Sequence, residues 1–458
     1  MAQNGKCNSL NSDEKTLLLK YLNNNTIKKR MDSIWFNEED LEDFNKYNDA
    51  EKLVDRIKLR TWQIKAKKYY KKECNGKAIF ESSTGSGKTF FAINLLDDLL
   101  KENPEYKTLI VVPKNVILET GWYKELTDYG FNIQDIGVYY GFTKEYGKVT
   151  ITNIQNFHKI ALQIFDVLIL DEIHNMATKR LLELVKTPFK HKIGLTATLK
   201  RQDNKHVELL KIFDYNVYKY NAKQALNDEV LNPFDFYNIS IDMDAQTKIL
   251  YDDYTQTINK LIIQNGSYSS LMKTQSPAKF KLLSIMNDRK KLVNNYEEKS
   301  VVVNEIINNN KNKKIIIFNQ FNEQTNKLYW QLLESGNTCR VVHSSISKEQ
   351  REQNLIDFKN DKYNVLLTSK VLDEGYNLPK LDLAIIMAGD SSDRQTIQRM
   401  GRVLRKKENS QSQLFQLYCK DTIEESSAVE RSKKFKSLSS TYKDIHHLTG
   451  TKTNIYTK

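Results

Sequence analysis

ESSTGSGKTFF, at residues 81–91, decides the fold because it joins a predicted strand to a predicted helix. The run KAIFE (77–81) before the loop is typical of a short buried strand. Apolar residues recur at helical spacing in FFAINLLDDLLKEN (90–103), which follows the loop. Only 16 of the 458 residues are glycine, yet Gly85 and Gly87 both lie here. The stretch is therefore a strand–loop–helix junction, as in an α/β domain.

The composition of this loop predicts a phosphate-binding nest. A helix N-terminus presents unpaired N–H groups and the positive end of the helix dipole. Gly85 and Gly87 let the backbone curl so that several N–H groups face one anion. Lys88 can then reach the outer phosphates of a nucleotide, and the Thr89 hydroxyl can bind Mg²⁺. The expected nucleotide-binding residues of the loop are Ser82, Ser83, Thr84, Gly85, Ser86, Gly87, Lys88 and Thr89.

One residue of the loop departs from the usual pattern G-x-x-x-x-G-K-[ST], because Ser82 stands where the first glycine is expected. The alternative interpretation is an ordinary Gly/Ser turn before a helix. The flanking strand and helix patterns favour the nucleotide site.

A second motif, FDVLILDEIHN, occupies residues 165–175. Its continuous apolar run VLIL is typical of a strand buried on both faces. Asp171 and Glu172 follow at the carboxyl end, where ligands bind in open α/β sheets. Asp171 is expected to hold Mg²⁺ through water, and Glu172 to orient and deprotonate the attacking water. The alternative is an ordinary polar cap on the strand.

TGSGKT (84–89) and DEIH (171–174) together resemble the nucleotide-binding motifs of superfamily 2 helicases and translocases. Other stretches resemble the remaining motifs in the family's order. They are LRTWQ (59–63), IVVPKNVILETGW (110–122), GLTATLKR (194–201), IIIFNQFNEQTNKL (315–328), LLTSKVLDEGYNLP (366–379) and QRMGRVLRK (398–406). Among the branches, the chain is most similar to the XPB/UvsW-like DExH helicases, and its Asn/Lys/Ile-rich composition suits a phage or viral member.

This resemblance implies further residues for the nucleotide site. Gln63 would read adenine, while Glu374 and Gly375 would lie near the nucleotide. Gln398, Arg402 and Arg405 would be catalytic, with the two arginines as fingers on the γ-phosphate. Helical spacing independently brings these arginines to one face, where guanidinium groups stabilise transferring phosphoryl charge. A basic solvated helix is the alternative for this segment taken alone.

The resemblance also implies residues that connect hydrolysis to a nucleic-acid strand. The expected coupling residues are His174, Thr196, Ala197 and Thr198. The expected strand contacts are Pro113, Lys114, Asn153, Gln320 and Thr368. Such contacts to phosphates position a strand without reading its sequence. The aromatic residues Trp62, Trp122 and Tyr376 could stack on bases, but we expect them in the core.

The predicted fold is α/β, with two tandem RecA-like P-loop domains, each with a parallel sheet, and a small helical N-terminal region. ATP would bind between the two domains. The predicted borders are 1–58 for the N-terminal accessory region, 59–227 for the first RecA-like domain, 228–425 for the second, with a helical segment near 245–312, and 426–458 for a basic tail. The tail is expected to be solvated.

Charge and composition limit the partners. The net charge is +13, which favours a polyanion such as nucleic acid. No apolar run reaches the roughly 18 residues needed to span a bilayer, so no membrane partner is expected. The N-terminus lacks the apolar region of a signal peptide, and the 4 cysteines form no CxxC pair. We therefore expect a reduced intracellular setting, such as the cytoplasm of a bacterial or phage-infected cell.

The expected function is that of an ATP-dependent DNA helicase or translocase, a nucleic-acid-stimulated ATPase with ATP and Mg²⁺ as cofactors. Its substrate would be duplex, forked or branched DNA in replication, recombination or repair. Two alternatives stay open: an RNA helicase, and an ATP-driven clamp that locks onto nucleic acid without separating strands. A strand-splitting wedge would distinguish the clamp from a helicase, and no stretch of the sequence identifies one.

Overall fold

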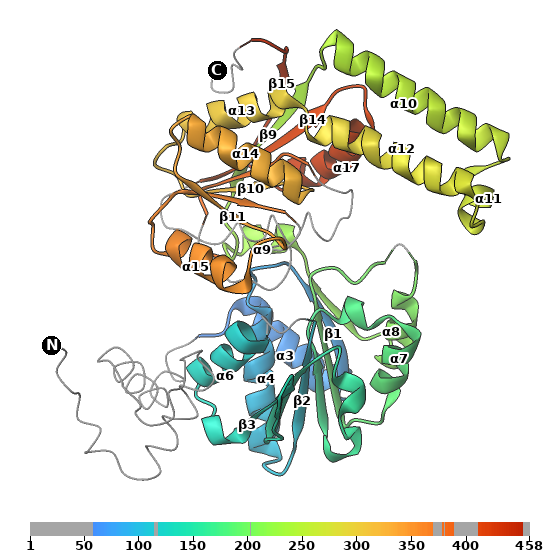
Figure 1. Cartoon of the computed structure of the whole chain (residues 1–458). Helices are drawn as coiled ribbons and strands as arrows, with labels where there is room; N and C mark the ends of the chain where they lie inside the picture. Colours follow the sequence, from blue (N-terminus) through green and yellow to red (C-terminus); the bar gives the residue numbers. More distant parts are fainter. Residues whose placement is uncertain are drawn as a thin grey trace, which may run out of the picture. The chain divides into compact units, whose positions relative to one another are not determined.

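The computed structural model describes residues 58–113, 118–201, 203–369, 378–379, 381–388 and 411–451. These residues form two compact units that divide between Asn221 and Ala222 (Figure 1). The predicted border at residue 227 lies slightly later, so α9 (Ala222–Asn227) groups with the second unit. The predicted N-terminal region lies outside the described residues, apart from Lys58.

The first unit is built on a sheet with the strand order β4-β3-β5-β2-β6-β7-β1-β8. Strands β3 and β4 pair antiparallel, and the other neighbouring strands run parallel. The strands are β1 (Lys77–Ser82), β2 (Thr108–Val112), β3 (Ile136–Tyr140), β4 (Thr143–Lys144), β5 (Val149–Asn153), β6 (Val167–Leu170), β7 (His191–Thr196) and β8 (Val217–Tyr220). The carboxyl ends of the parallel strands therefore meet at one edge.

Helices cover both faces of this sheet, with α3, α4 and α6 on one side and α7 and α8 on the other (Figure 1). Their bounds are α3 (Thr61–Glu73), α4 (Lys88–Glu102), α6 (Lys124–Tyr129), α7 (Lys179–Lys186) and α8 (His206–Ile212). Because both faces are covered, β2 and β6 are buried along their whole length. This is why TLIVV and VLIL read as continuous apolar runs rather than alternating ones.

The second unit is built on a sheet with the order β11-β12-β10-β13-β14-β9-β15, and its neighbouring strands run parallel. Its strands are β9 (Phe234–Ile241), β10 (Ile315–Phe318), β11 (Cys339–Val342), β12 (Val365–Thr368), β13 (Leu383–Ile386), β14 (Ser412–Cys419) and β15 (Thr441–His447). The helices other than α9 are α10 (Ala245–Gln264), α11 (Tyr268–Lys273), α12 (Pro277–Asn294), α13 (Glu297–Asn308), α14 (Asn322–Glu334), α15 (Lys348–Lys359) and α17 (Ile423–Lys436). Two α/β units with parallel sheets confirm the predicted fold class.

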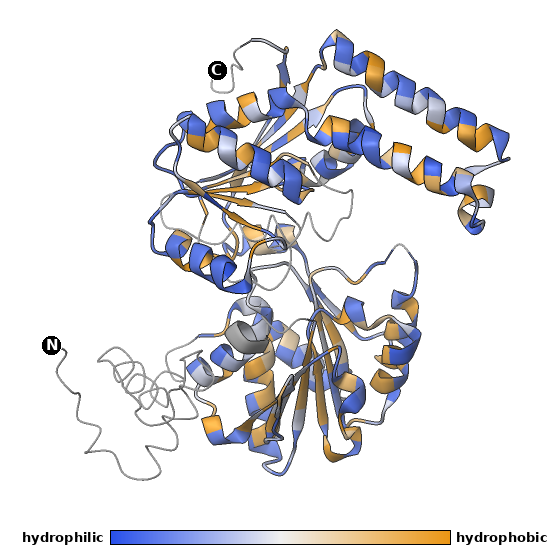
Figure 2. Ribbon diagram, viewed as in Figure 1, coloured by the Kyte–Doolittle hydropathy of each residue, from blue (hydrophilic) through white to orange (hydrophobic). Residues whose placement is uncertain are grey.

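The segment predicted to be helical near 245–312 contains α10, α11, α12 and α13. Helices α10 and α12 project from the sheet as a hairpin, and both contain hydrophilic and hydrophobic residues along their length (Figure 2). Ile258, Leu271 and Leu282 form a small apolar cluster within this hairpin. No helix within the described ranges is long and apolar enough to cross a membrane.

The prediction of a solvated C-terminal tail was wrong for the described part of that segment. Strand β15 pairs with β9 along its length, and α17 packs against β14 and β9. Phe435 of α17 is buried, with its ring centroid 4.9 Å from that of Phe236. A polar composition is compatible with a strand at the edge of a sheet, because one of its sides remains open to solvent. Composition alone therefore misjudged this segment.

Candidate nucleotide-binding site

The loop between β1 and α4 lies at the carboxyl edge of the first sheet. Gly85 and Gly87 have φ angles of 82° and 92°, in the left-handed region that favours glycine. A Cβ atom on Gly87 would lie 3.0 Å from Nε2 of Gln63. Both the backbone conformation and the close neighbour therefore require glycine at position 87.

Lys88 lies across this loop, where its Nζ donates to the carbonyl oxygens of Ser82 at 2.9 Å and Ser83 at 3.3 Å. The hydroxyl of Ser86 donates to the hydroxyl of Ser82 at 3.1 Å. This hydrogen bond accommodates a serine where the usual motif has glycine.

Several features of the loop fit a nucleotide phosphate. The hydroxyl oxygens of Ser83 and Thr84 are buried without a hydrogen-bond partner. The first turn of α4 has no acidic residue that would oppose an anion. Unpartnered hydroxyls, a lysine and a helix N-terminus together match the groups that bind phosphate in proteins. Thr89, in the first turn of α4, is half-buried and available as a metal ligand.

Asp171 and Glu172 follow β6, which is separated from β1 by β7 alone. The backbone N–H of Glu172 donates to Oδ1 of Asp171 at 3.0 Å. Glu172 has a φ angle of 45°, an uncommon conformation for a residue with a side chain. Such strain is frequent at functional sites, and here it turns the chain sharply between the two carboxylates.

Lys88 and the two carboxylates share one electrostatic environment. Burial lowers the pKa of Lys88, and the negative charges of Glu172 and Asp171 oppose this change. Burial raises the pKa of Asp171, while a hydrogen bond from Trp122 and the charge of Lys88 oppose it. The structure thus brings together the lysine and the acidic pair that the two motifs predicted.

His174 connects this acidic pair to the end of β7. Its Nδ1 lies 3.0 Å from Oγ1 of Thr196 and 3.4 Å from Oε2 of Glu172. Oγ1 of Thr196 donates to the carbonyl of Thr198 and accepts from its N–H. Ala197 lies between them and is half-buried. The residues predicted to couple hydrolysis to movement therefore form one hydrogen-bonded group beside Glu172.

The first turn of α3, together with Arg60 before it, braces the phosphate loop. Oε1 of Gln63 accepts from the N–H of Arg60 at 2.8 Å, and its Nε2 donates to the carbonyl of Gly87 at 3.0 Å. Nη1 of Arg60 and Nε1 of Trp62 both donate to the carbonyl of Ser86, at 2.7 and 3.2 Å. The role of Gln63 as adenine reader stays a prediction. The bracing by Arg60 and Trp62 was not predicted.

Trp62 and Trp122 were expected in the core, and both are buried. Each indole nevertheless reaches the site. Nε1 of Trp62 donates to the carbonyl of Ser86, and Nε1 of Trp122 donates to Oδ2 of Asp171 at 2.9 Å. Trp122 and Asp171 are 49 positions apart in the chain, so no local spacing signals their contact. Tyr376, the third aromatic of this prediction, lies outside the described residues.

The described strand-contact candidates lie at or just after the ends of four strands, β2, β5, β10 and β12. Pro113 follows β2 and is half-buried, and Asn153 ends β5 and is buried. Gln320 and Thr368 belong to the second unit and are also buried. The Thr368 hydroxyl lies 2.9 Å from the carbonyl oxygens of both Val342 and Ser369. Contacts of these side chains with nucleic acid stay predictions.

The remaining predicted site residues lie outside the described part of the chain, so their roles stay predictions. They are Lys114, Glu374, Gly375, Gln398, Arg402 and Arg405.

Within the described ranges, no group of three or more His, Cys, Asp or Glu residues could hold a metal ion. Mg²⁺ differs from metals that need such a group, since it is usually bound by one or two protein oxygens together with substrate phosphates and water. Thr89 and Asp171 supply oxygens of this kind. The donor set of the first unit therefore fits Mg²⁺ bound with a nucleotide.

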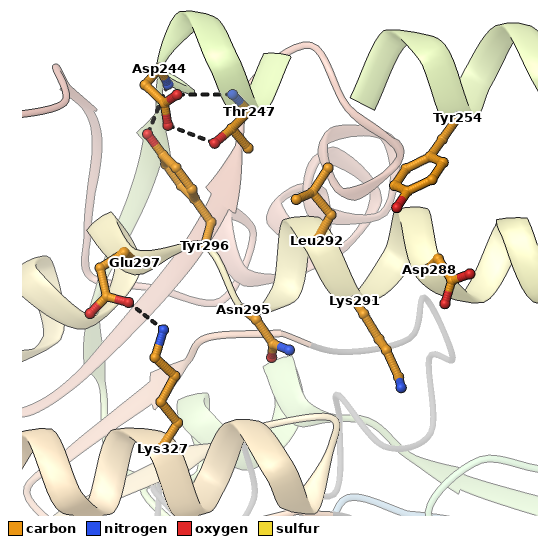
Figure 3. Close-up of a pocket in the computed structure, with 10 residues that line it drawn as sticks. All are labelled: Asp244, Thr247, Tyr254, Asp288, Lys291, Leu292, Asn295, Tyr296, Glu297 and Lys327. Atoms are coloured by element: carbon orange, nitrogen blue, oxygen red, sulfur yellow. Dashed lines mark hydrogen bonds and ion pairs between the residues drawn. The ribbon is translucent and has the colours of Figure 1, made fainter. Parts of the chain in front are cut away.

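A separate groove of about 490 Å³ lies in the second unit, between the helical hairpin and α14 (Figure 3). Some of its polar groups pair with one another. Asp244 caps α10 through Thr247, and Glu297 pairs with Lys327. None of the predicted site residues lines this groove, which is formed by Asp244, Thr247, Tyr254, Asp288, Lys291, Leu292, Asn295, Tyr296, Glu297 and Lys327.

Comparison with protein families matches two models to this chain. The model of the type III restriction enzyme, res subunit, matches residues 56–201. The model of the helicase conserved C-terminal domain matches residues 298–407. The first match contains the phosphate loop and the acidic pair, and the second contains β10, β11 and β12.

Similar proteins include DNA translocases and helicases. The DNA 3'-5' translocase XPB2 of Sulfurisphaera tokodaii is 28% identical over 388 residues, which cover 81% of this chain and 84% of that protein. A candidate helicase of Sulfolobus islandicus filamentous virus is 23% identical, over 81% of this chain and 66% of that protein. The DNA 3'-5' helicase XPB of Mycobacterium tuberculosis is 21% identical, over 85% of this chain and 67% of that protein.

Two solved structures share this fold. The Hef helicase domain of Pyrococcus furiosus aligns with a TM-score of 0.55 and 16% identity, covering 81% of this chain and 98% of that one. Dbp5 of S. cerevisiae, bound to RNA and ADP BeF3, aligns with a TM-score of 0.59 and 14% identity, covering 88% of this chain and 94% of that one. These likenesses support the RecA-like architecture of both units. The two matched models and the XPB-type relatives support the assignment of the chain as a superfamily 2 helicase of the XPB-like type.

Proposed function

We propose that the chain hydrolyses ATP to move along DNA and to separate or remodel strands in duplex, forked or branched DNA. The observation that carries this proposal is the convergence of Lys88, Asp171 and Glu172 at the carboxyl edge of the first sheet. A lysine on a phosphate loop with a buried acidic pair is the equipment of a nucleotide hydrolase.

Each residue of the first unit has a distinct role in this proposal. The loop N–H groups and Lys88 bind the phosphates, while Thr89 and Asp171 hold Mg²⁺. Bound Mg²⁺ neutralises charge on the β- and γ-phosphates. Glu172 accepts a proton from the attacking water, and its position 3.4 Å from His174 Nδ1 keeps it beside the coupling group.

The second unit supplies Arg402 and Arg405, with Gln398, to the γ-phosphate. A guanidinium stabilises the charge that spreads over the phosphate oxygens in the transition state. Hydrolysis then requires both units, and release of phosphate removes the contacts that favoured closure. His174 and Thr196 transmit this change, since their hydrogen bond joins the acidic pair to the end of β7.

DNA is the proposed track. The names of XPB2 and of the Mycobacterium tuberculosis XPB specify both DNA and 3'-5' polarity. We infer the same polarity for this chain. The net charge of +13 suits a polyanionic partner. An intracellular setting is favoured for two reasons. The proposed partner, DNA, is found inside cells, and the thiols of Cys74, Cys339 and Cys419 are buried and free.

The test is the ATPase rate of the full chain with no polynucleotide, single-stranded DNA, duplex DNA, forked DNA and RNA. Salt is held constant, because phosphate contacts make affinity salt-dependent. We expect the strongest stimulation with forked or branched DNA. Stimulation by RNA alone would move the protein to RNA metabolism.

Strand displacement from a forked duplex distinguishes a helicase from an ATP-driven clamp. A helicase releases the displaced strand in proportion to ATP hydrolysed. A clamp hydrolyses ATP and retains DNA without releasing a strand, and this outcome would replace the proposal. Single-stranded overhangs of either polarity on the same duplex test the 3'-5' direction.

A further inference from the structure

Among the described residues of the first unit, two buried tryptophans, Trp62 and Trp122, direct their indole N–H groups into the nucleotide site. Nε1 of Trp62 donates to the carbonyl of Ser86 in the phosphate loop. Nε1 of Trp122 donates to Oδ2 of Asp171 at 2.9 Å. Trp122 is completely buried, so water cannot replace its hydrogen-bond partner. Leaving such a donor unpaired costs about 1–3 kcal/mol.

The Asp171 carboxylate is held through both of its oxygens. Oδ1 accepts from the N–H of Glu172 at 3.0 Å, and Oδ2 accepts from Trp122. Two donors on different oxygens fix the rotation of the carboxylate plane. Each oxygen has more than one acceptor position, so the group can still bind a cation.

The position of Trp122 depends on an unusual element. Residues Leu118–Tyr123 form a π-helical turn, η4, which continues directly into α6. π-Helical turns are rare and frequently occur at functional sites. Trp122 lies within this turn, so the backbone of the turn places its indole beside Asp171.

We propose that Trp122 is a positioning residue for the metal site, whose indole N–H orients the Asp171 carboxylate for Mg²⁺. This inference rests on the proposed function, which makes Asp171 a metal-binding residue. Partners that orient a metal-binding group typically change metal affinity by about 10–100-fold when they are removed. Trp62, by contrast, acts on the phosphate loop and not on the carboxylate.

Trp122→Phe removes the N–H and keeps a buried aromatic ring, and Trp62→Phe is its matched control. Mn²⁺, a paramagnetic substitute for Mg²⁺, is titrated by electron paramagnetic resonance into the complex of the full chain with ADP. We expect Trp122→Phe to weaken Mn²⁺ binding by about tenfold or more. Its affinity for a fluorescent ADP analogue in EDTA should change less than about twofold. Trp62→Phe should have the opposite effect: it should weaken binding of the ADP analogue in EDTA and retain the Mn²⁺ affinity.

Unchanged Mn²⁺ affinity in folded Trp122→Phe would overturn the inference, and so would equal losses in both variants. Asp171→Asn separates this failure from failure of the proposed function. If Asp171→Asn also leaves Mn²⁺ affinity unchanged, Asp171 is not the metal ligand and the proposed site is wrong. If Asp171→Asn weakens Mn²⁺ binding and Trp122→Phe does not, the proposed metal site is supported and only the positioning role of Trp122 is rejected.

A measurement on the unaltered residue keeps the test valid if Trp122→Phe does not fold. The chain has 4 tryptophans, so 5-fluorotryptophan labelling gives four ¹⁹F signals. Trp35→Phe, Trp62→Phe and Trp330→Phe assign the Trp122 signal by elimination. We expect Mg²⁺ added to the ADP complex to shift the Trp122 signal more than that of Trp62. No shift of the Trp122 signal would contradict the inference.

Discussion

The two units share an architecture but differ at comparable strand–helix junctions. In the first unit, β1 leads into α4 through Gly85 and Gly87, both in the left-handed region. In the second, β10 leads into α14 through residues 319–321, which include no glycine. The first turn of α4 has no acidic residue, whereas Glu323 lies in the first turn of α14. A helix N-terminus attracts anions, so only the first junction is built for phosphate.

The polar side chains at the two junctions also behave differently. At the first junction, Lys88 and Ser86 form hydrogen bonds with Ser82, and the buried hydroxyls without a partner, those of Ser83 and Thr84, lie in the loop proposed to bind phosphate. In the second unit, Asn319 is completely buried, and neither polar atom of its side-chain amide has a hydrogen-bond partner. The comparison teaches that a RecA-like sheet provides positions for chemistry, while the loop after each strand decides whether chemistry occurs there.

The largest expected effect tests whether the second unit contributes to hydrolysis although its β10–α14 junction has no glycine. Arg405→Ala should lower kcat by about 10³-fold or more, because an arginine finger stabilises the transition state. ATP affinity should change far less. Steady-state kinetics with forked DNA check this split. If affinity falls and kcat does not, Arg405 binds ATP without stabilising the transition state.

Glu172→Gln tests the base assigned to the first unit. Loss of the proton acceptor should lower the ATPase rate by about 10²–10⁴-fold, while DNA binding is retained. Glu183→Gln, at an exposed position of α7, is the matched control and should keep the full rate. Phosphate release and DNA binding by fluorescence anisotropy check both expectations. Normal hydrolysis in Glu172→Gln would reject Glu172 as the base.

Gly87→Ala tests whether the glycine conformation creates the difference between the junctions. The added Cβ would lie 3.0 Å from Gln63 Nε2 in a strained backbone, so we expect at least a tenfold loss of nucleotide affinity, worth about 1.4 kcal/mol. Gly336→Ala is the matched control. Gly336 has a φ of 79° and an added Cβ there would meet no atom within 4 Å, so the substitution introduces similar backbone strain away from the phosphate loop. Titration of a fluorescent ADP analogue compares the two. Equal affinities in both variants would contradict this prediction.

Asn319→Leu tests the second junction and should have the smallest effect. Leucine has the same number of side-chain heavy atoms and no polar group, so we expect stabilisation of β10 by about 1 kcal/mol. Thr368→Val is the matched control. It removes a hydroxyl 2.9 Å from the Val342 carbonyl and should destabilise the same sheet by about 1 kcal/mol. Native-state hydrogen exchange of β10 measures both changes. Destabilisation by Asn319→Leu would show that the amide has a polar partner in solution.

Local patterns predicted the elements that carry the catalytic chemistry. VLIL reads as a strand because both faces of β6 are covered, and the helical spacing after residue 87 follows from the buried face of α4. Lys88, Asp171 and Glu172 were predicted together because the phosphate loop and the acidic pair each follow a recognisable strand. The same reasoning misjudged residues 441–447, whose polar composition conceals an edge strand that pairs with β9.

By itself, the sequence determined the α/β fold class, the phosphate loop and the acidic pair, because these depend on residues that are neighbours in the chain. Only the tertiary structure decided what supports them. Trp122 reaches Asp171 across 49 residues, and Arg60 reaches the Ser86 carbonyl across 26. Such contacts arise when parallel strands bring their carboxyl ends to one edge. The packing that forms these long-range contacts leaves no periodic pattern in the chain. Apolar spacing can therefore indicate that Trp122 is buried, but it does not show which carboxylate accepts from its N–H.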